Sequence, residues 1–238
     1  PLLLKLKAAD GKTDLYGLMY LPSQLDKNKK YPIISNVYPG PQDDQIPQSF
    51  TLDDNGNQSL AELGFIVINV APRGSSPLRG HDFYNFGYGN LRDYPLADDK
   101  SVIEQLAKNY PFIDLNRVGI YGHSGGAFQT VAAILTYPDF YKVAVAASGN
   151  HDNNMELAKN LKGHLMLITG DVDKNVPPSS TYRLADALIK ANKRFDMFIL
   201  PGKDHGVMCP YYQSRQRQMC IRDSIQPVKQ HIDIINHN

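Results

Sequence analysis

The chain has 238 residues, 42% of them hydrophobic, which is enough for one domain with a sizeable core. Its 25 basic and 24 acidic side chains nearly cancel, and no basic block points to nucleic acid or to a membrane surface. Two cysteines provide neither a disulfide framework nor a metal cluster, and no apolar run has the length of a membrane span. We therefore expect no cofactor, no metal, no nucleic-acid partner and no membrane segment. The N-terminus has neither a starting methionine nor a signal-peptide layout, so we expect an excerpt of a longer protein.

Strand-like and helix-like hydrophobic patterns alternate along the chain. Asp10-Gly11 is a hairpin turn signal between segments 2–7 and 15–21, which predicts an antiparallel pair at the edge of a sheet. Further strands are expected at 31–37, 65–70, 118–121, 141–147, 165–169 and 195–200. Helices are expected at 59–63, 96–110, 127–135 and 182–191, and 73–92 is expected to be a loop rich in glycine and aromatic residues. This alternation predicts an α/β fold with a mostly parallel sheet and helices on both faces.

The central motif is Gly122-His123-Ser124-Gly125-Gly126, between an apolar strand and a helix-compatible stretch. Strand, tight turn and helix in this order form the context of a nucleophile elbow, as in the α/β-hydrolase fold. The turn is so tight that the positions flanking the serine must be nearly free of side chain, which explains Gly122 and Gly126. The alternative is a glycine-rich turn with an incidental serine, but the flanking strand and helix favour Ser124 as a nucleophile.

A serine nucleophile needs a histidine to take its proton and an acid to orient that histidine. In α/β-hydrolases the order along the chain is serine, acid, histidine, with the acid and the histidine each just after a strand. Asp171 and Asp173 follow the strand expected at 165–169, and His205 follows the strand expected at 195–200. The order therefore predicts a triad of Ser124, one of the two aspartates and His205.

Two other histidine–aspartate pairs and one acidic pair are weaker candidates. His81-Asp82 and His151-Asp152 are expected to be surface or structural residues, because adjacent residues in one loop rarely orient each other toward a distant nucleophile. Asp98-Asp99 lies near the start of an expected helix, where we expect a solvated face or a charge that complements the helix dipole.

Five motifs together resemble the catalytic domain of the prolyl oligopeptidase family, and most of all its dipeptidyl-peptidase IV branch. They are V-Y-P-G-P at 37–41, R-G at 73–74, G-H-S-G-G at 122–126, D-K-N-V at 173–176 and D-H-G at 204–206. The resemblance covers about residues 2–213. It implies the α/β-hydrolase fold and a serine peptidase that cleaves through an acyl-enzyme, after proline or alanine near the N-terminus of peptides. It also implies Ser124 as nucleophile, Asp173 as acid and His205 as base.

The same resemblance implies an oxyanion hole and a substrate-binding set. The Tyr38 hydroxyl and the Gly125 N–H are the implied oxyanion donors, and Pro39-Gly40-Pro41 is expected to hold Tyr38 rigidly. Asn175, Val176 and His123 would lie beside the substrate, with Val176 against the side chain before the scissile bond. His123 stands where the mammalian enzyme has tryptophan, and we expect it to be a turn residue.

Family members place a β-propeller before this domain, and the propeller binds the free N-terminus of the peptide. The resemblance therefore implies a peptide substrate, a propeller in the full-length parent and a periplasmic or extracellular location, and it allows a homodimer. After Met155 the sequence omits a family segment that carries pocket-lining aromatic residues, so we expect broader specificity than the family's. An esterase with the same triad, a non-catalytic binding module and a catalytically impaired fragment are the alternatives.

The stretch R-Q-R-Q-M-C-I-R-D-S at 215–224 resembles the translation of a transposon mosaic-end sequencing adapter rather than a family helix. The alternative is a polar surface helix of unusual composition. We expect residues 1–213 to be the catalytic domain and residues 214–238 to be a non-native tail.

Overall fold

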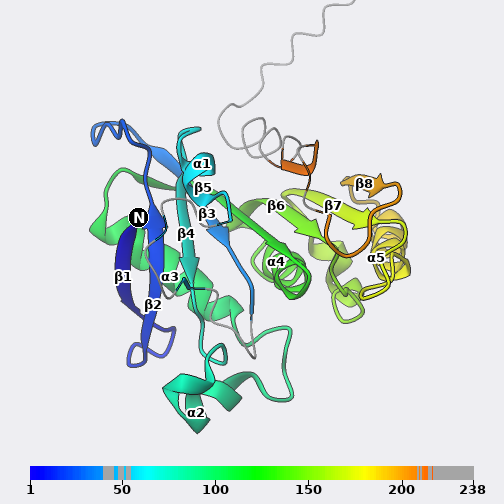
Figure 1. Ribbon diagram of the computed structural model, residues 1–238, viewed down its shortest axis with the longest axis horizontal. Helices are drawn as coiled ribbons and strands as arrows, with labels where there is room; N and C mark the ends of the chain where they lie inside the picture. The colour runs from blue at the N-terminus through cyan, green and yellow to red at the C-terminus, as the bar shows by residue number, and fades with distance from the viewer. Residues whose placement is uncertain are drawn as a thin grey trace, which may run out of the picture.

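The computed structural model describes residues 1–39, 46–47, 51, 55–207, 209, 211–213 and 216. Its strands form one eight-stranded sheet in the order β1-β2-β4-β3-β5-β6-β7-β8 (Figure 1). The strands are β1 (Leu2–Lys7), β2 (Asp14–Tyr20), β3 (Tyr31–Asn36), β4 (Ile66–Val70), β5 (Ile113–His123), β6 (Tyr141–Ala147), β7 (His164–Gly170) and β8 (Asp196–Leu200). The α-helices are α1 (Asn57–Ala61), α2 (His81–Tyr84), α3 (Leu96–Asn109), α4 (Gly125–Thr136) and α5 (Ser179–Lys190).

The sheet begins with the predicted antiparallel hairpin and continues as a parallel sheet. β1 pairs with β2, and β2 pairs with β4, both antiparallel, whereas every pair from β4 to β8 is parallel. The hairpin turn depends on Asp10, whose carboxylate accepts hydrogen bonds from the backbone N–H groups of Lys12 and Thr13. The mostly parallel α/β-hydrolase sheet expected from the sequence is confirmed.

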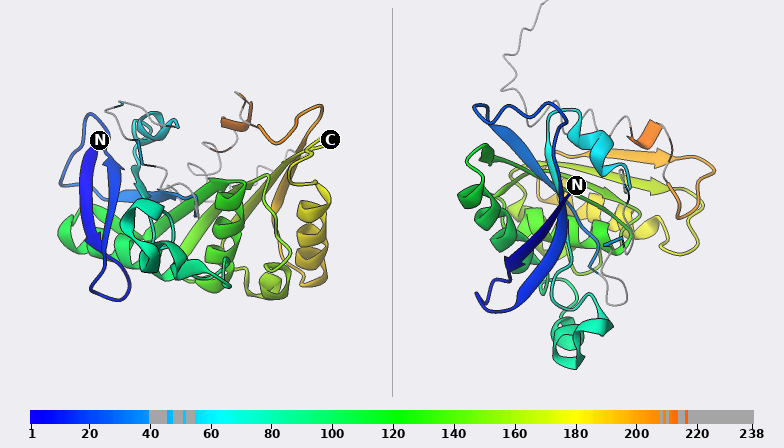
Figure 2. Two further views of the ribbon diagram at one scale, coloured as in Figure 1. Left: turned by 60° about the horizontal axis from the view of Figure 1, so that its bottom comes forward. Right: turned by 60° about the vertical axis from the view of Figure 1, so that its left-hand side comes forward.

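Helices cover both faces of the sheet, but unequally (Figure 2). On one face α3, α4 and α5 bury apolar residues such as Leu106, Val131 and Leu188 in one continuous core. On the other face α1 contributes Leu60 and Ala61 to a second core against the strands. Burial on both faces explains why the central strands are continuous apolar runs rather than alternating patterns.

The segment expected to be a loop at 73–92 contains three short helices instead. They are the 3-10 helices η1 (Pro77–Arg79) and η2 (Asn85–Gly87), with α2 between them. The Ser76 hydroxyl accepts a hydrogen bond from the backbone N–H of Leu78, and Pro77 lies at the start of η1, where its fixed φ favours a helical turn. A further 3-10 helix, η3 (Met155–Asn160), begins at the residue after which the sequence is expected to lack a family segment.

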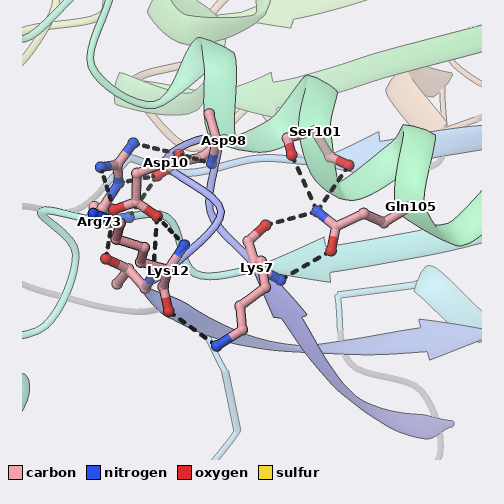
Figure 3. Close-up of polar contacts among 9 residues, drawn as sticks. Lys7, Asp10, Lys12, Arg73, Asp98, Ser101 and Gln105 are labelled. Atoms are coloured by element: carbon pink, nitrogen blue, oxygen red, sulfur yellow. Dashed lines mark hydrogen bonds and ion pairs between the residues drawn. The ribbon is translucent and has the colours of Figure 1, made fainter.

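Asp98 and Asp99 are buried, so the expectation of a solvated face is wrong. Figure 3 shows Arg73 between Asp98 of α3 and Asp10 of the hairpin turn. Its Nε and Nη2 donate to the two Asp98 oxygens at 2.9 and 2.7 Å, and its Nη1 donates to Asp10 at 3.0 Å. The neighbouring Asp99 accepts hydrogen bonds from the hydroxyls of Ser35 and Tyr141, and burial raises its pKa. The two carboxylates therefore anchor α3 to the sheet.

Candidate active site

Ser124 lies in the turn between β5 and α4, at the carboxyl edge of the sheet. Its backbone has φ 57° and ψ −119°, a conformation that residues with a side chain rarely adopt. The turn is held by backbone hydrogen bonds: the Ser124 N–H donates to the Ala147 carbonyl, and the N–H groups of Ala127 and Phe128 donate to the Ser124 carbonyl. Strand, strained serine and helix together are the geometry of a nucleophile elbow.

Gly122 and Gly126 leave no room for a side chain. A Cβ on Gly126 would lie 2.1 Å from the carbonyl oxygen of Val37. A Cβ on Gly122 would lie 2.4 Å from the carbonyl carbon of Gly126 and 2.6 Å from the same Val37 oxygen. These backbone atoms cannot move aside, so the prediction that both flanking glycines are required is confirmed.

Asp173 follows β7 and hydrogen-bonds to His205, which follows β8. The distance from Asp173 Oδ2 to His205 Nδ1 is 2.8 Å. The other oxygen, Oδ1, accepts from the backbone N–H groups of Asn175 at 2.9 Å and Val176 at 2.8 Å. Because an ionised carboxylate only accepts, Nδ1 of His205 carries the proton, and Nε2 of the neutral ring is left to accept one. Asp173 therefore fixes the tautomer that a general base needs.

Asp171, the other acid that the sequence left open, has a different role. Its Oδ1 accepts from the backbone N–H of Gly202 at 2.7 Å, which ties the turn after β7 to the turn after β8. Asp204 links the same two loops, since its Oδ1 accepts from the backbone N–H groups of Lys174 and His205. The aspartate that contacts the His205 ring is thus Asp173.

His123 lies against His205 and is more than a turn residue. Its Nε2 is 2.7 Å from the carbonyl oxygen of His205, and the two ring centroids are 4.7 Å apart. Burial lowers the pKa of His123. Within the part of the chain that the structure describes, no hydrogen bond joins the Ser124 hydroxyl to His205, so His123 is the direct polar link between the elbow and the loop that carries His205.

Tyr38 follows β3 and lies beside the backbone of Gly125. A Cβ built on Gly125 would be 3.8 Å from Tyr38 Cζ, the ring carbon that carries the hydroxyl. The strand end is fixed by a hydrogen bond from the Val37 N–H to the Tyr121 carbonyl. Gly40 and Pro41, expected to stiffen this loop, lie outside the described residues. The tyrosine and the first amide of α4 therefore lie on the same side of Ser124.

A pocket of about 360 Å³ opens beside Ser124, and Tyr38 and Gly125 line it. Val176 also lines this pocket, whereas Asn175 lies in the turn that caps Asp173. A second pocket of about 350 Å³ is lined by Tyr38 and His123. The three predicted substrate-binding residues are thus divided between the first pocket, the Asp173 turn and the second pocket.

Three residues with large apolar side chains line the first pocket but were not predicted from the sequence. They are Leu91, Tyr94 and Phe128. Phe128 follows the elbow by one helical turn, a signal that was available from the helix period. Leu91 and Tyr94 come from the end of the segment expected to be a loop and from the residues after it, where no local pattern indicated a wall of the site.

The weaker histidine–aspartate pairs do not form base–acid pairs. His81 and Asp82 are exposed and 3.4 Å apart. His151 is buried, and Asp152 instead pairs with Arg183 at 2.5 Å. The described residues contain no cluster of three or more histidine, cysteine or acidic side chains placed to hold a metal. They also contain no helix with the length and apolar character needed to cross a bilayer.

Comparison with known proteins gives a family match over most of the chain. The model of peptidase family S9, the prolyl oligopeptidase family, matches residues 51–162 and 153–221. Human dipeptidyl peptidase 8 is 30% identical over 226 residues, which cover 82% of this chain and 25% of the relative. Dipeptidyl aminopeptidase A of Saccharomyces cerevisiae is 26% identical over 247 residues, with 90% and 26% covered. The chain thus spans about a quarter of the length of these curated relatives.

Solved structures agree with this match. A Bacteroides ovatus protein assigned as a dipeptidyl aminopeptidase IV superposes with a TM-score of 0.83 at 28% identity, covering 93% of this chain and 35% of that one. Dipeptidyl peptidase 4 of Porphyromonas gingivalis shares the fold, with a TM-score of 0.86 at 22% identity and the same coverage. The chain belongs to the prolyl oligopeptidase family.

Proposed function

We propose that residues 1–213 are the catalytic domain of a serine peptidase with Ser124, Asp173 and His205 as its triad. The observation that carries this proposal is the 2.8 Å hydrogen bond between Asp173 and His205, on the loops that follow β7 and β8 beside the strained Ser124 elbow. The parallel strands β3, β5, β7 and β8 all end at this edge of the sheet, where the ligand sites of α/β folds lie.

In the proposed reaction, the Ser124 oxygen attacks the carbonyl carbon of the scissile peptide bond. His205 Nε2 takes the serine proton and gives it to the leaving amine, which breaks the C–N bond and leaves an acyl-enzyme. A water molecule then attacks the acyl carbon by the same route and frees Ser124. Asp173 stabilises the imidazolium that forms in each half-reaction. The hydrogen bond between Ser124 and His205 forms when substrate binds, as catalytic contacts often tighten only in the complex.

The oxyanion that develops on the carbonyl oxygen is assigned to the Gly125 N–H and the Tyr38 hydroxyl. Gly125 is the first residue of α4, so its N–H has no partner within the helix and the positive end of the helix dipole lies behind it. Tyr38 contributes a hydroxyl donor from the end of the neighbouring parallel strand β3. Two donors aimed at the developing charge act mainly on the transition state, which is the source of their catalytic effect.

The substrate is proposed to be a peptide whose side chain before the scissile bond enters the first pocket, against Val176. Two named relatives are dipeptidyl peptidases or aminopeptidases, and they are about four times as long as this chain. We infer a parent protein that carries a propeller in its remaining length. Because Leu91, Tyr94 and Phe128 supply only part of the lining, beside the polar Asn150, Asp152 and Asn153, we infer a broader preference than proline alone.

The test is labelling by a fluorophosphonate probe, which reacts only with an activated serine. The wild-type chain should label and Ser124→Ala should not, and peptide turnover of Ser124→Ala should fall by about 10⁴–10⁶-fold. A chain that never labels is a binding module or an impaired fragment. A chain that labels but cleaves only p-nitrophenyl esters, and no peptide amide, is an esterase.

Residues 214–238 are proposed to be foreign to the parent, and within them the structure describes Gln216 alone. Gln216 lines the second pocket, so this proposal decides whether that pocket has its native boundary. Resequencing the source DNA from the codon of Gln213 to that of Ile225 is the test. A source DNA sequence that still encodes the stretch at 215–224 would overturn the proposal.

A further inference from the structure

The first pocket has two walls that are far apart in the sequence. One wall is formed by Leu91 and Tyr94, and the other includes Asn153 from the loop after β6. No strand pairing joins the two segments, because neither belongs to the sheet. The width of the pocket therefore depends on the side chains that hold the segments together.

The Tyr94 ring packs closely against two glycines, Gly74 and Gly87. A Cβ on Gly74 would lie 2.6 Å from Tyr94 Cε2, and a Cβ on Gly87 would lie 2.5 Å from Tyr94 Cδ1. The tyrosine is 8% exposed, and burial raises its pKa above the ordinary value of a phenol, so it stays neutral. The Tyr94 ring is therefore held in one position by its packing. If this segment shifts, we expect Leu91 and Tyr94 to move together.

Arg92 lies between the two wall residues in sequence and spans the two walls in space. Its Nε and Nη2 donate to the two oxygens of Asp93 at 2.6 and 3.1 Å. Its Nη1 donates to the Asn153 carbonyl at 2.7 Å and also contacts the Glu156 carboxylate. The Arg92 side chain is 20% exposed, so water screens these contacts only partly. All three guanidinium nitrogens of Arg92 donate hydrogen bonds. The single ammonium group of a lysine cannot make this set of bonds at once.

We propose that Arg92 is a positioning residue that joins the two walls and so sets which side chain the pocket accepts before the scissile bond. This inference rests on the proposed function. The wall with Leu91 and Tyr94 is apolar, and the facing wall is polar, with Asn150, Asp152 and Asn153, so the preferred side chains are those small enough to contact both walls. Without the Arg92 link the Asn153 wall separates from the Tyr94 wall, and a small side chain loses one of its two contacts. A large aromatic side chain still reaches both.

Arg92→Lys is the main variant, and Arg117→Lys is its matched control. Arg117 also bonds a neighbouring carboxylate and a distant carbonyl, those of Asp114 and Lys30, but it lies near the start of β5, away from the pocket. Chromogenic peptides with alanine or phenylalanine before the scissile bond are compared for kcat and KM. We expect Arg92→Lys to raise KM for the alanine peptide about tenfold with kcat little changed, the pattern of lost ground-state binding. The phenylalanine peptide and the control should change less than about threefold.

Fluorophosphonate labelling separates this inference from the proposed function. If the wild-type chain labels and cleaves both peptides, the proposed function stands, and equal changes for the two peptides in Arg92→Lys overturn the positioning role. If Arg92→Lys fails to fold, Glu156→Gln decides, because it removes the charge from an exposed partner of the same link. A shift in the alanine-to-phenylalanine ratio in Glu156→Gln in the same direction supports the role, and an unchanged ratio overturns it.

Discussion

His123 Nε2 donates a hydrogen bond to the backbone carbonyl oxygen of His205 at 2.7 Å, although the two residues are 82 positions apart. A carbonyl oxygen only accepts, so Nε2 of His123 carries a proton. Burial lowers the pKa of His123, and the neighbouring His205 ring acts in the same direction once it is charged, so His123 stays neutral. The residue before Ser124 therefore holds the loop that carries the proposed base.

His123→Phe should lower kcat by about fivefold while KM changes little, since phenylalanine keeps the ring contact and removes one hydrogen bond worth about 1 kcal/mol. The measurement is steady-state kinetics on a peptide amide. His81→Phe, at an exposed site on α2, is the control and should leave kcat unchanged. A kcat for His123→Phe within the error of the wild-type value would remove His123 from the positioning of His205.

Tyr38→Phe tests the oxyanion donor, because it removes the hydroxyl and keeps the ring. Turnover should fall by about 10²–10³-fold, or roughly 2.7–4 kcal/mol of transition-state stabilisation, with KM and melting temperature little changed. Tyr182→Phe, on the exposed side of α5, is the matched control. A packing role for Tyr38 predicts turnover within a few-fold of wild type, and that result would leave the Gly125 amide in need of another partner.

His151 should make the stability of the chain fall with acid. Burial lowers its pKa to about 3, and its ring nitrogens have no hydrogen-bond partner among the described residues. In the unfolded chain its pKa is about 6.5, so between about pH 6.5 and 3 the unfolded state binds the proton that the folded state rejects. The free energy of unfolding should therefore fall by about 1.4 kcal/mol for each pH unit in this window, and the contribution is absent above it.

Urea unfolding of wild type and His151→Leu at pH 7, 6 and 5 measures this contribution. The variant should lose less stability per pH unit than the wild type, whatever its stability at pH 7. His81→Leu should keep the wild-type slope, because His81 is exposed. Equal slopes for wild type and His151→Leu would show that His151 is not held neutral in the folded chain.

Asp98→Asn should destabilise the chain by about 3 kcal/mol, since it leaves the mostly buried Arg73 guanidinium with only the partly exposed Asp10. Arg73→Met combined with Asp98→Leu should recover part of that loss, because replacing both members of a buried pair removes the unpaired charge. Urea unfolding at constant pH measures both. Asp82→Asn is the control at an exposed carboxylate. A loss below 0.5 kcal/mol for Asp98→Asn, the range of ordinary surface changes, would contradict a structural role for the Arg73 link.

The elbow, and an aspartate after β7 beside His205, were predictable because their signals are local, whereas the choice of Asp173 over Asp171 came from the family resemblance. The Ser124 turn is specified by glycines within two residues of it, and Asp173 and His205 each follow an apolar strand. The links between segments were not predictable, because they join residues far apart in the chain. Arg92 reaches Asn153 and His123 reaches His205, and nothing in the local pattern of either residue indicates its partner. Asp98 lies in the first turn of α3, which fits a charge that complements the helix dipole, but its burial against Arg73 was not predictable, since a helical pattern does not show which distant residue neutralises a charge.

The left-handed φ of Ser124 creates a conflict between activity and folding stability. The proposed chemistry needs a serine at this position, whereas the backbone conformation favours glycine. A side chain in this conformation costs about 1–3 kcal/mol, and glycine adopts it at little cost. Ser124→Gly should therefore unfold at a higher temperature than Ser124→Ala, although both lack the proposed nucleophile, and thermal melts of the two variants measure the difference. A search for thermostable variants of this chain by stability alone would then select Ser124→Gly, which removes the proposed nucleophile. A screen that also measures turnover would keep the serine.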